Sequence, residues 1–327
     1  MDTTVFRRLF HHVQIACSCD RDVATALDAR LGRFPLAEPG QDDLVFDYRR
    51  VGPGGSHQVE PISGPTRSIY NSAIGEVLYS DAEDRIYLTV GDRVRVACDP
   101  RRGHTRISIV DFGDEHLWLS THPLFTLPLI ESLKRRGRYS LHAAGVAIGG
   151  KAILFPGTSG AGKSTLALAM VREGFGFLGD DMLFLAHGKD GLRALAFPES
   201  VDLTDDTIRL FPDLEKLLEQ PKPPGWPKRQ LRAEERYSAA IAWDCQPVAL
   251  VFPRVARGGR SVLEPMDPGE ALLELAPNIL LTESRSSQAH LDALGELVRA
   301  CRCYRLETGS DFKDVAARLR ALVEVEG

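Results

Sequence analysis

The sequence has no long uninterrupted apolar run, and this absence limits the classes of protein that it can encode. None of its hydrophobic stretches approaches the length of about 20 residues that a membrane-spanning helix needs. Residues 1–12 lack the apolar core of a secretory signal peptide. Internal repeats and low-complexity segments are absent as well. We therefore expect a cytoplasmic globular protein that has no membrane partner.

An excess of positive charge is also lacking. The formal net charge is −5, so the composition carries no electrostatic footprint of nucleic acid binding. Six cysteines are present, and four of them form Cys-x-Cys pairs at Cys17/Cys19 and Cys301/Cys303. Structural zinc sites favour Cys-x₂-Cys or longer spacings, which are lacking here. We expect these cysteines to be reduced structural thiols.

The two parts of the chain differ in their residue patterns. Up to about residue 130, short β-rich runs alternate with turn residues, which predicts a small, mostly antiparallel domain. This part carries no catalytic constellation, so a scaffold role and recognition of a substrate or partner both remain open. After it, strand and helix patterns alternate around a mixed sheet. The expected fold class is α/β, with a β-rich N-terminal domain over residues 1–130 and a second domain over residues 131–327.

Residues 157–164 fit the phosphate-binding loop pattern G-x-x-x-x-G-K-[ST] without a gap. An apolar stretch of strand length precedes the loop, and a run of strong helix formers follows it. In such a loop the inward-pointing amides and the helix N-terminus bind phosphate. We expect the Lys163 ammonium to bind the β- and γ-phosphates and the Ser164 hydroxyl to ligate Mg²⁺. The candidate nucleotide-binding residues are Gly157, Thr158, Ser159, Gly160, Ala161, Gly162, Lys163, Ser164 and Thr165.

Two features flank this loop. A second apolar strand ends in the pair Asp180-Asp181, and strands of such sheets carry ligand-binding residues at their carboxyl ends. One carboxylate can hold Mg²⁺ while the other accepts a proton, because repulsion between adjacent acids raises the pKa of one. Upstream, we expect His142 to lie far down a strand that Gly149-Gly150 turns directly into the strand of the loop. This pattern predicts a hairpin that brings His142 close to the phosphates.

His142, the phosphate-binding loop and the Asp pair together resemble the catalytic domain of the bacterial HPr kinase/phosphorylase family. They look most like its kinase-only relatives, including those that phosphorylate a terminal serine of lasso peptides. The resemblance implies a P-loop kinase core of the HPr-kinase/PEP-carboxykinase type with a mixed sheet. It also implies Asp181 as the base toward a seryl hydroxyl, Lys163 and Ser164 on ATP and Mg²⁺, and His142 in the active site.

The chain departs from that family after the Asp pair. The Arg-Gly-Leu-Gly-type run of the bifunctional members is missing, which predicts a kinase without phosphorylase activity. Phe197-Pro-Glu199 stands in the corresponding region. Glu199 is therefore the candidate for the metal-side glutamate, and the expected metal ligands are Ser164, Asp180 and Glu199.

Two basic stretches are candidates for further phosphate contacts. Residues 220–232 are rich in proline and can form neither a regular helix nor a central strand, so a surface linker is one interpretation. The resemblance suggests a mobile loop that supplies a catalytic cation, with Arg232 ranked ahead of Lys228 and Arg229. Residues 134–138 follow a helix expected over residues 117–134. For this second stretch, a solvated face and contact with the nucleotide both remain open.

The pattern as a whole favours ATP- and Mg²⁺-dependent transfer of the γ-phosphoryl group to a seryl hydroxyl of a peptide or protein. A kinase that acts on free serine would use the same residues. A non-catalytic nucleotide-sensing module would need the loop but not Asp181. A motor or transport ATPase is disfavoured, because no signature of coupling is present. The acceptor and the oligomeric state are open, and a homo-oligomer is one alternative because family members are often hexamers.

Overall fold

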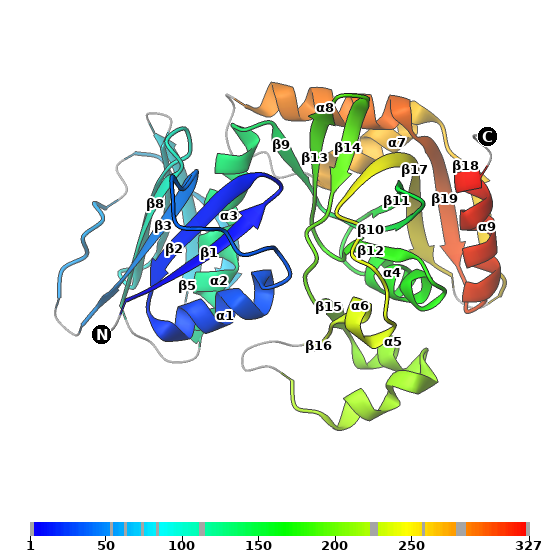
Figure 1. Ribbon diagram of the computed structural model, residues 1–327, viewed down its shortest axis with the longest axis horizontal. Coiled ribbons are helices and arrows are strands. Elements are labelled where there is room, and N and C mark those ends of the chain that lie inside the picture. The colour runs from blue at the N-terminus through cyan, green and yellow to red at the C-terminus, as the bar shows by residue number, and fades with distance from the viewer. Residues whose placement is uncertain are drawn as a thin grey trace. The chain divides into compact units, whose positions relative to one another are not determined.

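The computed structural model describes residues 3–52, 55–61, 64–72, 75–82, 85–110, 115–222, 228–256, 259–278 and 286–324. The chain divides into two compact units, Met1–Arg136 and Gly137–Gly327, whereas the sequence predicts a boundary near residue 130. Each unit combines helices with a sheet of mixed strand direction, so the chain has a mixed α/β fold (Figure 1). Among the described residues, no helix has the length and apolar character needed to cross a bilayer.

An eight-stranded sheet forms the first unit, in the order β1-β2-β3-β8-β7-β6-β5-β4. The pairs β2–β3 and β3–β8 are parallel, and the remaining neighbours are antiparallel. The elements are β1 (Thr4–Phe10), β2 (Val13–Cys19), α1 (Arg21–Leu31), β3 (Leu44–Val51), β4 (Arg67–Ser72), β5 (Gly75–Ala82), β6 (Arg85–Val90), β7 (Val94–Asp99), β8 (His104–Val110), α2 (Glu115–Thr121) and α3 (Pro123–Lys134).

Two helices of this unit, α1 and α3, begin at residues that favour a helix start. Asp20 caps α1 by accepting a 3.1 Å hydrogen bond from the Val23 amide. The single helix expected over residues 117–134 is wrong, because two helices, α2 and α3, occupy that stretch. Pro123 begins α3, since proline lacks an amide hydrogen and fits the first turn of a helix better than its interior.

Three residues of the basic stretch, Lys134, Arg135 and Arg136, make their contacts within the first unit. Lys134 and Glu131 form a 2.9 Å ion pair whose side chains are both fully buried. Arg135 donates to the same glutamate, and Arg136 donates to the backbone carbonyls of Pro100, Ser132 and Asp43. These contacts favour a structural role for the stretch over the alternative of nucleotide binding, because a buried ammonium with a buried counter-ion is costly to separate.

A nine-stranded sheet forms the core of the second unit. Seven strands follow the order β12-β10-β11-β17-β14-β13-β9, and β19 pairs with both β17 and β18. The elements are β9 (Arg138–Leu141), β10 (Ala143–Ile148), β11 (Lys151–Pro156), α4 (Lys163–Arg172), β12 (Gly176–Gly179), β13 (Leu183–Gly188), β14 (Gly191–Leu195), β15 (Val201–Leu203), α5 (Asp205–Arg209), the 3₁₀ helix η1 (Pro212–Glu219), β16 (Arg229–Leu231), α6 (Ala233–Arg236), β17 (Asp244–Val255), β18 (Val262–Pro265), α7 (Pro268–Leu275), the 3₁₀ helix η2 (Ala276–Asn278), α8 (Ser287–Ala300), β19 (Arg302–Thr308) and α9 (Phe312–Glu324).

The order of three strands places the candidate site residues at one edge of this sheet. β10 lies between β11 and β12 and is antiparallel to both. The carboxyl ends of β11 and β12 and the amino end of β10 therefore meet at the same edge. The predicted Gly149-Gly150 hairpin joins β10 to β11, with Ile148 opposite Lys151. Both glycines have positive φ, as a two-residue hairpin turn requires.

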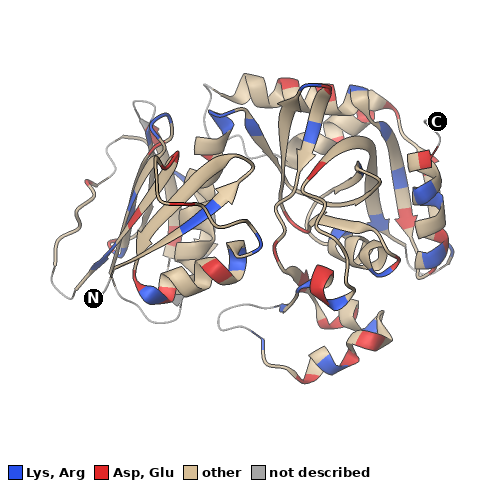
Figure 2. Ribbon diagram, in the orientation of Figure 1, with Lys and Arg blue, Asp and Glu red and all other residues tan. Residues whose placement is uncertain are grey.

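Apolar side chains cover both faces of this sheet and hold the edge in place. One buried cluster packs α4 and α9 against one face, and a second packs α7 and α8 against the other. These helices lie around the sheet in Figure 1. Figure 2 shows basic and acidic residues interspersed along α8 and α9, so neither helix presents charge of a single sign. Helix α7 ends at Leu275, and the 3₁₀ helix η2 continues the chain to Asn278.

Candidate active site

The candidate phosphate loop connects β11 to α4 and has the backbone that its glycines allow. Gly162, the residue that caps α4, has φ of 97°, a left-handed conformation that strains other residues. Glycine also carries no side chain that could accept from the first amides of the helix. Gly174 follows the helix with φ of 91°, at the C′ position where glycine is common. The loop thus ends in a helix N-terminus suited to an anion.

The ammonium group of Lys163 is directed back over this loop. Its Nζ donates to the carbonyls of Gly157, at 2.6 Å, and Thr158, at 3.2 Å, and it lies 3.0 Å from Nε2 of His142. Lys163 is only 6% exposed, and this burial lowers the pKa of its ammonium group. The nearby carboxylates of Asp181 and Asp180 oppose that shift in the pKa. The lysine is thus held where a bound polyphosphate would meet it.

His142 links the lysine to Asp181. A lysine ammonium can only donate, so Nε2 of His142 accepts and the ring proton resides on Nδ1. Nδ1 lies 2.8 Å from the Asp181 backbone oxygen and 3.3 Å from its Oδ1. The expectation that His142 lies far down a strand is wrong, because it occupies the break between β9 and β10. From this position the ring contacts Lys163 after β11 and Asp181 after β12.

The two adjacent carboxylates differ sharply in environment. The Asp181 side chain is 73% exposed, whereas Asp180 is 4% exposed. Burial raises the pKa of Asp180 to about 7, and the charge of Asp181 contributes to the rise. Hydrogen bonds from the Ser164 hydroxyl and the Asp202 amide counteract it by favouring the ionised form. Asp180 Oδ1 is buried and accepts no hydrogen bond from the described residues.

Ser164 and Asp180 are the expected metal ligands that the structure brings together. A divalent cation fits the buried, unpartnered Asp180 oxygen beside a serine hydroxyl, since both are hard oxygen ligands. Glu199 is half-buried in the segment that begins at Phe197, whose carbonyl closely approaches Gly179 at the end of β12. Within the described ranges, no three His, Cys, Asp or Glu side chains form a metal-binding group. Glu199 therefore stays a prediction.

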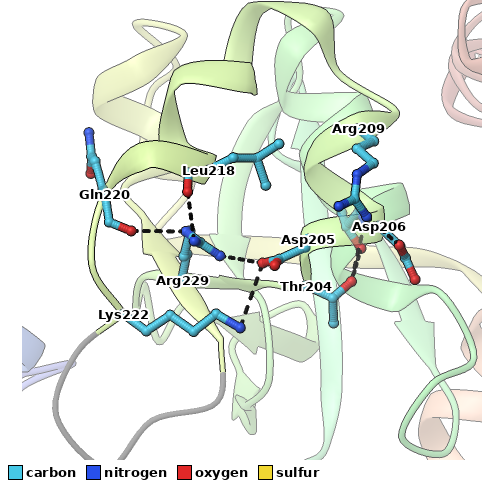
Figure 3. Close-up of polar contacts among 9 residues, drawn as sticks. Thr204, Asp205, Asp206, Arg209, Leu218, Gln220, Lys222 and Arg229 are labelled. Carbon is cyan, nitrogen blue, oxygen red and sulfur yellow. Dashed lines mark hydrogen bonds and ion pairs between the residues drawn. The ribbon is translucent and has the colours of Figure 1, made fainter.

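The three basic candidates within residues 228–232 differ in their contacts. Arg232 is half-exposed and pairs with Glu235 of its own helix at 2.7 Å. Arg229 is directed into a contact with Asp205 (Figure 3). The charge of Lys228 contributes to lowering the pKa of Lys163. The ranking of Arg232 ahead of Lys228 has no support in these contacts.

Asn278 is a site residue that sequence reasoning missed. Its Oδ1 accepts the Gly157 amide at 3.1 Å, and its backbone oxygen accepts the His142 amide at 2.7 Å. Its Nδ2 in turn donates to the carbonyl of Glu274 in α7. Asn278, which is 3% exposed, thereby holds the start of the phosphate loop through its side chain and the His142 backbone through its own backbone oxygen. No motif surrounds Asn278 in the sequence, so no local signal could have identified it.

All six cysteines of the chain are buried and unpaired with one another, in keeping with the structural thiols that we expected. Burial raises the pKa of the Cys17, Cys19, Cys98, Cys245 and Cys303 thiols. A buried neutral thiol is a poor nucleophile and a poor metal ligand. The cysteines therefore contribute to the cores of the two units and not to the site.

Comparison with known proteins yields distant likenesses to solved structures only. No protein family matches the chain, and no curated protein matches it. Among solved structures, the chain is similar to the HPr(Ser) kinase/phosphatase from Coxiella burnetii, with a TM-score of 0.30 and 12% identity. The match covers 57% of this chain and 94% of that chain. A TM-score this low transfers neither fold nor activity, so the argument for function rests on the residues of the site.

Proposed function

We propose that this protein is a kinase that transfers the γ-phosphoryl group of ATP to the hydroxyl of a serine in a peptide or protein. The observation that carries the proposal is the hydrogen-bonded series from Lys163 through His142 to Asp181. It sets an exposed carboxylate beside the lysine of a phosphate-binding loop. A module that only senses nucleotide would need the loop and lysine but no exposed carboxylate beside them.

One set of residues binds the triphosphate and a second set would bind Mg²⁺. Lys163 and the amides of residues 157–165 bind the triphosphate, as the loop pattern predicts. Ser164 and Asp180 would hold Mg²⁺, which neutralises charge on phosphate oxygens when it is bound. Burial of Asp180 suits that role, because a cation then meets a carboxylate with little competing water.

Asp181 supplies the proton acceptor. The acceptor hydroxyl oxygen bonds to the γ-phosphorus as the bond between that phosphorus and the β–γ bridging oxygen breaks. The hydroxyl proton passes to Asp181, and ADP departs with the bridging oxygen. His142 holds the backbone and carboxylate of Asp181, while the cations of Lys163 and Lys228 offset the charge of the phosphoryl group in the transition state. Most of the rate gain then comes from position and charge.

The seryl nature of the acceptor rests on the motif resemblance alone. The site residues themselves fit any hydroxyl that can reach Asp181. A small-molecule kinase acting on free serine is therefore the second candidate, and substrate assays separate the two.

A transfer assay with γ-labelled ATP and Mg²⁺ tests the proposal. The full chain is offered serine-containing peptides, free serine and HPr in parallel. Label should appear on one class of acceptor, should vanish in Asp181→Asn while ATP binding persists, and should remain in the control Asp206→Asn. Asp206 is a 94% exposed carboxylate paired with Arg209. Tight ATP binding with neither label nor ATP hydrolysis would contradict the kinase and favour the sensing module.

A further inference from the structure

Val255, the last residue of β17, is an apolar residue that stands largely in the open. It is 65% exposed, whereas residues 247–253 of the same strand are all buried. Exposure alone carries no argument, because single apolar residues are common on protein surfaces. What distinguishes Val255 is its place in the fold, since it ends a strand that runs beside the strand of the phosphate loop.

The end of β17 borders the phosphate loop at two of its glycines. A Cβ atom at Gly162 would lie 3.2 Å from Cγ2 of Val255, and one at Gly157 would lie 4.0 Å from Cδ of Pro253. Gly162 caps α4 and directly precedes Lys163, so the Val255 methyl group lies against the end of the loop that meets the helix N-terminus. An exposed apolar surface is therefore continuous with the candidate anion site.

The order of the strands sets Val255 and the Asp pair on opposite sides of the loop. β17 is parallel to β11 and pairs with it on the side away from β10 and β12. The carboxylates of Asp180 and Asp181 follow β12, while Val255 ends β17. In the proposed function the γ-phosphate faces Asp181. The opposite end of the triphosphate, which carries the nucleoside, then extends away from Asp181 and toward the end of β17.

We propose that Val255 contacts the nucleobase of the bound nucleotide, whose flat face covers the valine methyl groups. The inference rests on the proposed function, since it needs a nucleotide with its γ-phosphate at Asp181. Ligand sites combine apolar surface with a few polar anchors, and here the loop supplies the anchors. Covering Val255 removes apolar surface from water, which favours binding. A methyl group reads no hydrogen-bonding edge, so this contact serves adenine and guanine alike.

Calorimetric titration of the full chain with ATP, GTP and inorganic tripolyphosphate, each with Mg²⁺, tests the contact. Tripolyphosphate offers the phosphates without a base. Val255→Ser should weaken ATP and GTP by the same factor of about five, the scale for covering most of one valine side chain, and should leave tripolyphosphate unchanged. The control Leu273→Ser should change none of the three affinities. Leu273 is 77% exposed on α7, which packs on the face of the sheet opposite to α4.

Three results would overturn the inference. Unchanged affinity of Val255→Ser for ATP would show that the base does not cover this side chain. Equal weakening of ATP and tripolyphosphate would show that Val255 supports the loop and does not bind the base. A loss for ATP without one for GTP would show that the base is read by its polar edge. Should Val255→Ser fail to fold by circular dichroism, Val255→Ala takes its place with the same expectations.

The wild-type protein distinguishes failure of the base contact from failure of the proposed function. A wild type that binds neither ATP nor tripolyphosphate refutes the nucleotide site, and the ligand that Val255 would contact is then lost with it. A wild type that binds both, with a Val255→Ser variant that binds ATP equally well, refutes the base contact and leaves the kinase standing.

Discussion

Replacing Asp180 with asparagine should stabilise the protein more at pH 8 than at pH 5. Burial raises the pKa of this carboxyl from an ordinary value of 3.8 to about 7 in the folded chain. Between those values the folded state holds the proton while the unfolded state releases it. The contribution of Asp180 to stability is therefore greatest below pH 3.8 and is lost as the pH rises through about 7. Above that pH the folded protein contains a buried carboxylate.

The size of the effect follows from the same two values. A difference of about three pH units corresponds to about 4 kcal/mol, and about 3 kcal/mol of this falls between pH 5 and pH 8. Asparagine does not titrate, so Asp180→Asn loses this dependence. Its amide would place donors at the site of the unpartnered Oδ1, with a pH-independent cost of about 1–3 kcal/mol. The stability of the variant relative to wild type should thus rise by about 3 kcal/mol from pH 5 to pH 8.

Urea unfolding of wild type, Asp180→Asn and Asp181→Asn at both pH values measures this difference, with Mg²⁺ and nucleotide absent. Asp181→Asn is the matched control because the Asp181 side chain is 73% exposed. Hydrogen exchange of peptides from β10 to β12 at the same pH values assigns the change to the second unit. The reasoning fails if Asp180→Asn shifts stability equally at pH 5 and pH 8, or if the control shows the same dependence on pH.

The remaining predictions concern the loop, its support and the thiols. Lys163→Met should weaken ATP binding by at least about tenfold in a calorimetric titration, and unchanged affinity would refute its place on the phosphates. Asn278→Ala leaves the partly buried Gly157 amide without its acceptor, so it should lower the free energy of unfolding by about 1 kcal/mol and raise KM for ATP more than it lowers kcat. A fall in kcat with no change in KM would argue against a role of Asn278 in holding the phosphate loop. The buried thiols should react slowly with a disulfide reagent at pH 8 in the folded protein and fully in denaturant, and rapid reaction of the folded protein would contradict their burial.

Local patterns predict much of the second unit. The hairpin at Gly149-Gly150, the strand, loop and helix around Lys163, and the paired strands β13 and β14 all follow from apolar periodicity and glycine positions. These features depend on residues that are close in the sequence, where propensity and turn chemistry act directly.

The long-range parts of the site could not be predicted in this way. Asn278 meets Gly157 across 121 residues, and the Asp202 amide reaches Asp180 from a separate strand. The sequence could nominate the basic residues 228–232 but could not rank them, because their positions depend on the contact between Arg229 and Asp205. The different burial of Asp180 and Asp181 also depends on tertiary packing, since the two residues are adjacent and chemically identical.

The contacts that define the site also imply an order of assembly during folding. The contact of Lys163 with His142 spans 21 residues and that of His142 with Asp181 spans 39, whereas Asn278 must close a loop of 121 residues to reach Gly157. Closure of longer loops costs more entropy and slows folding. The β10–β11 hairpin, the phosphate loop and α4 are therefore expected to form early. While the chain is still growing on the ribosome, the phosphate loop lacks its contact with Asn278 until α7 and η2 have emerged. We therefore expect the chain to gain the ability to bind nucleotide late in synthesis.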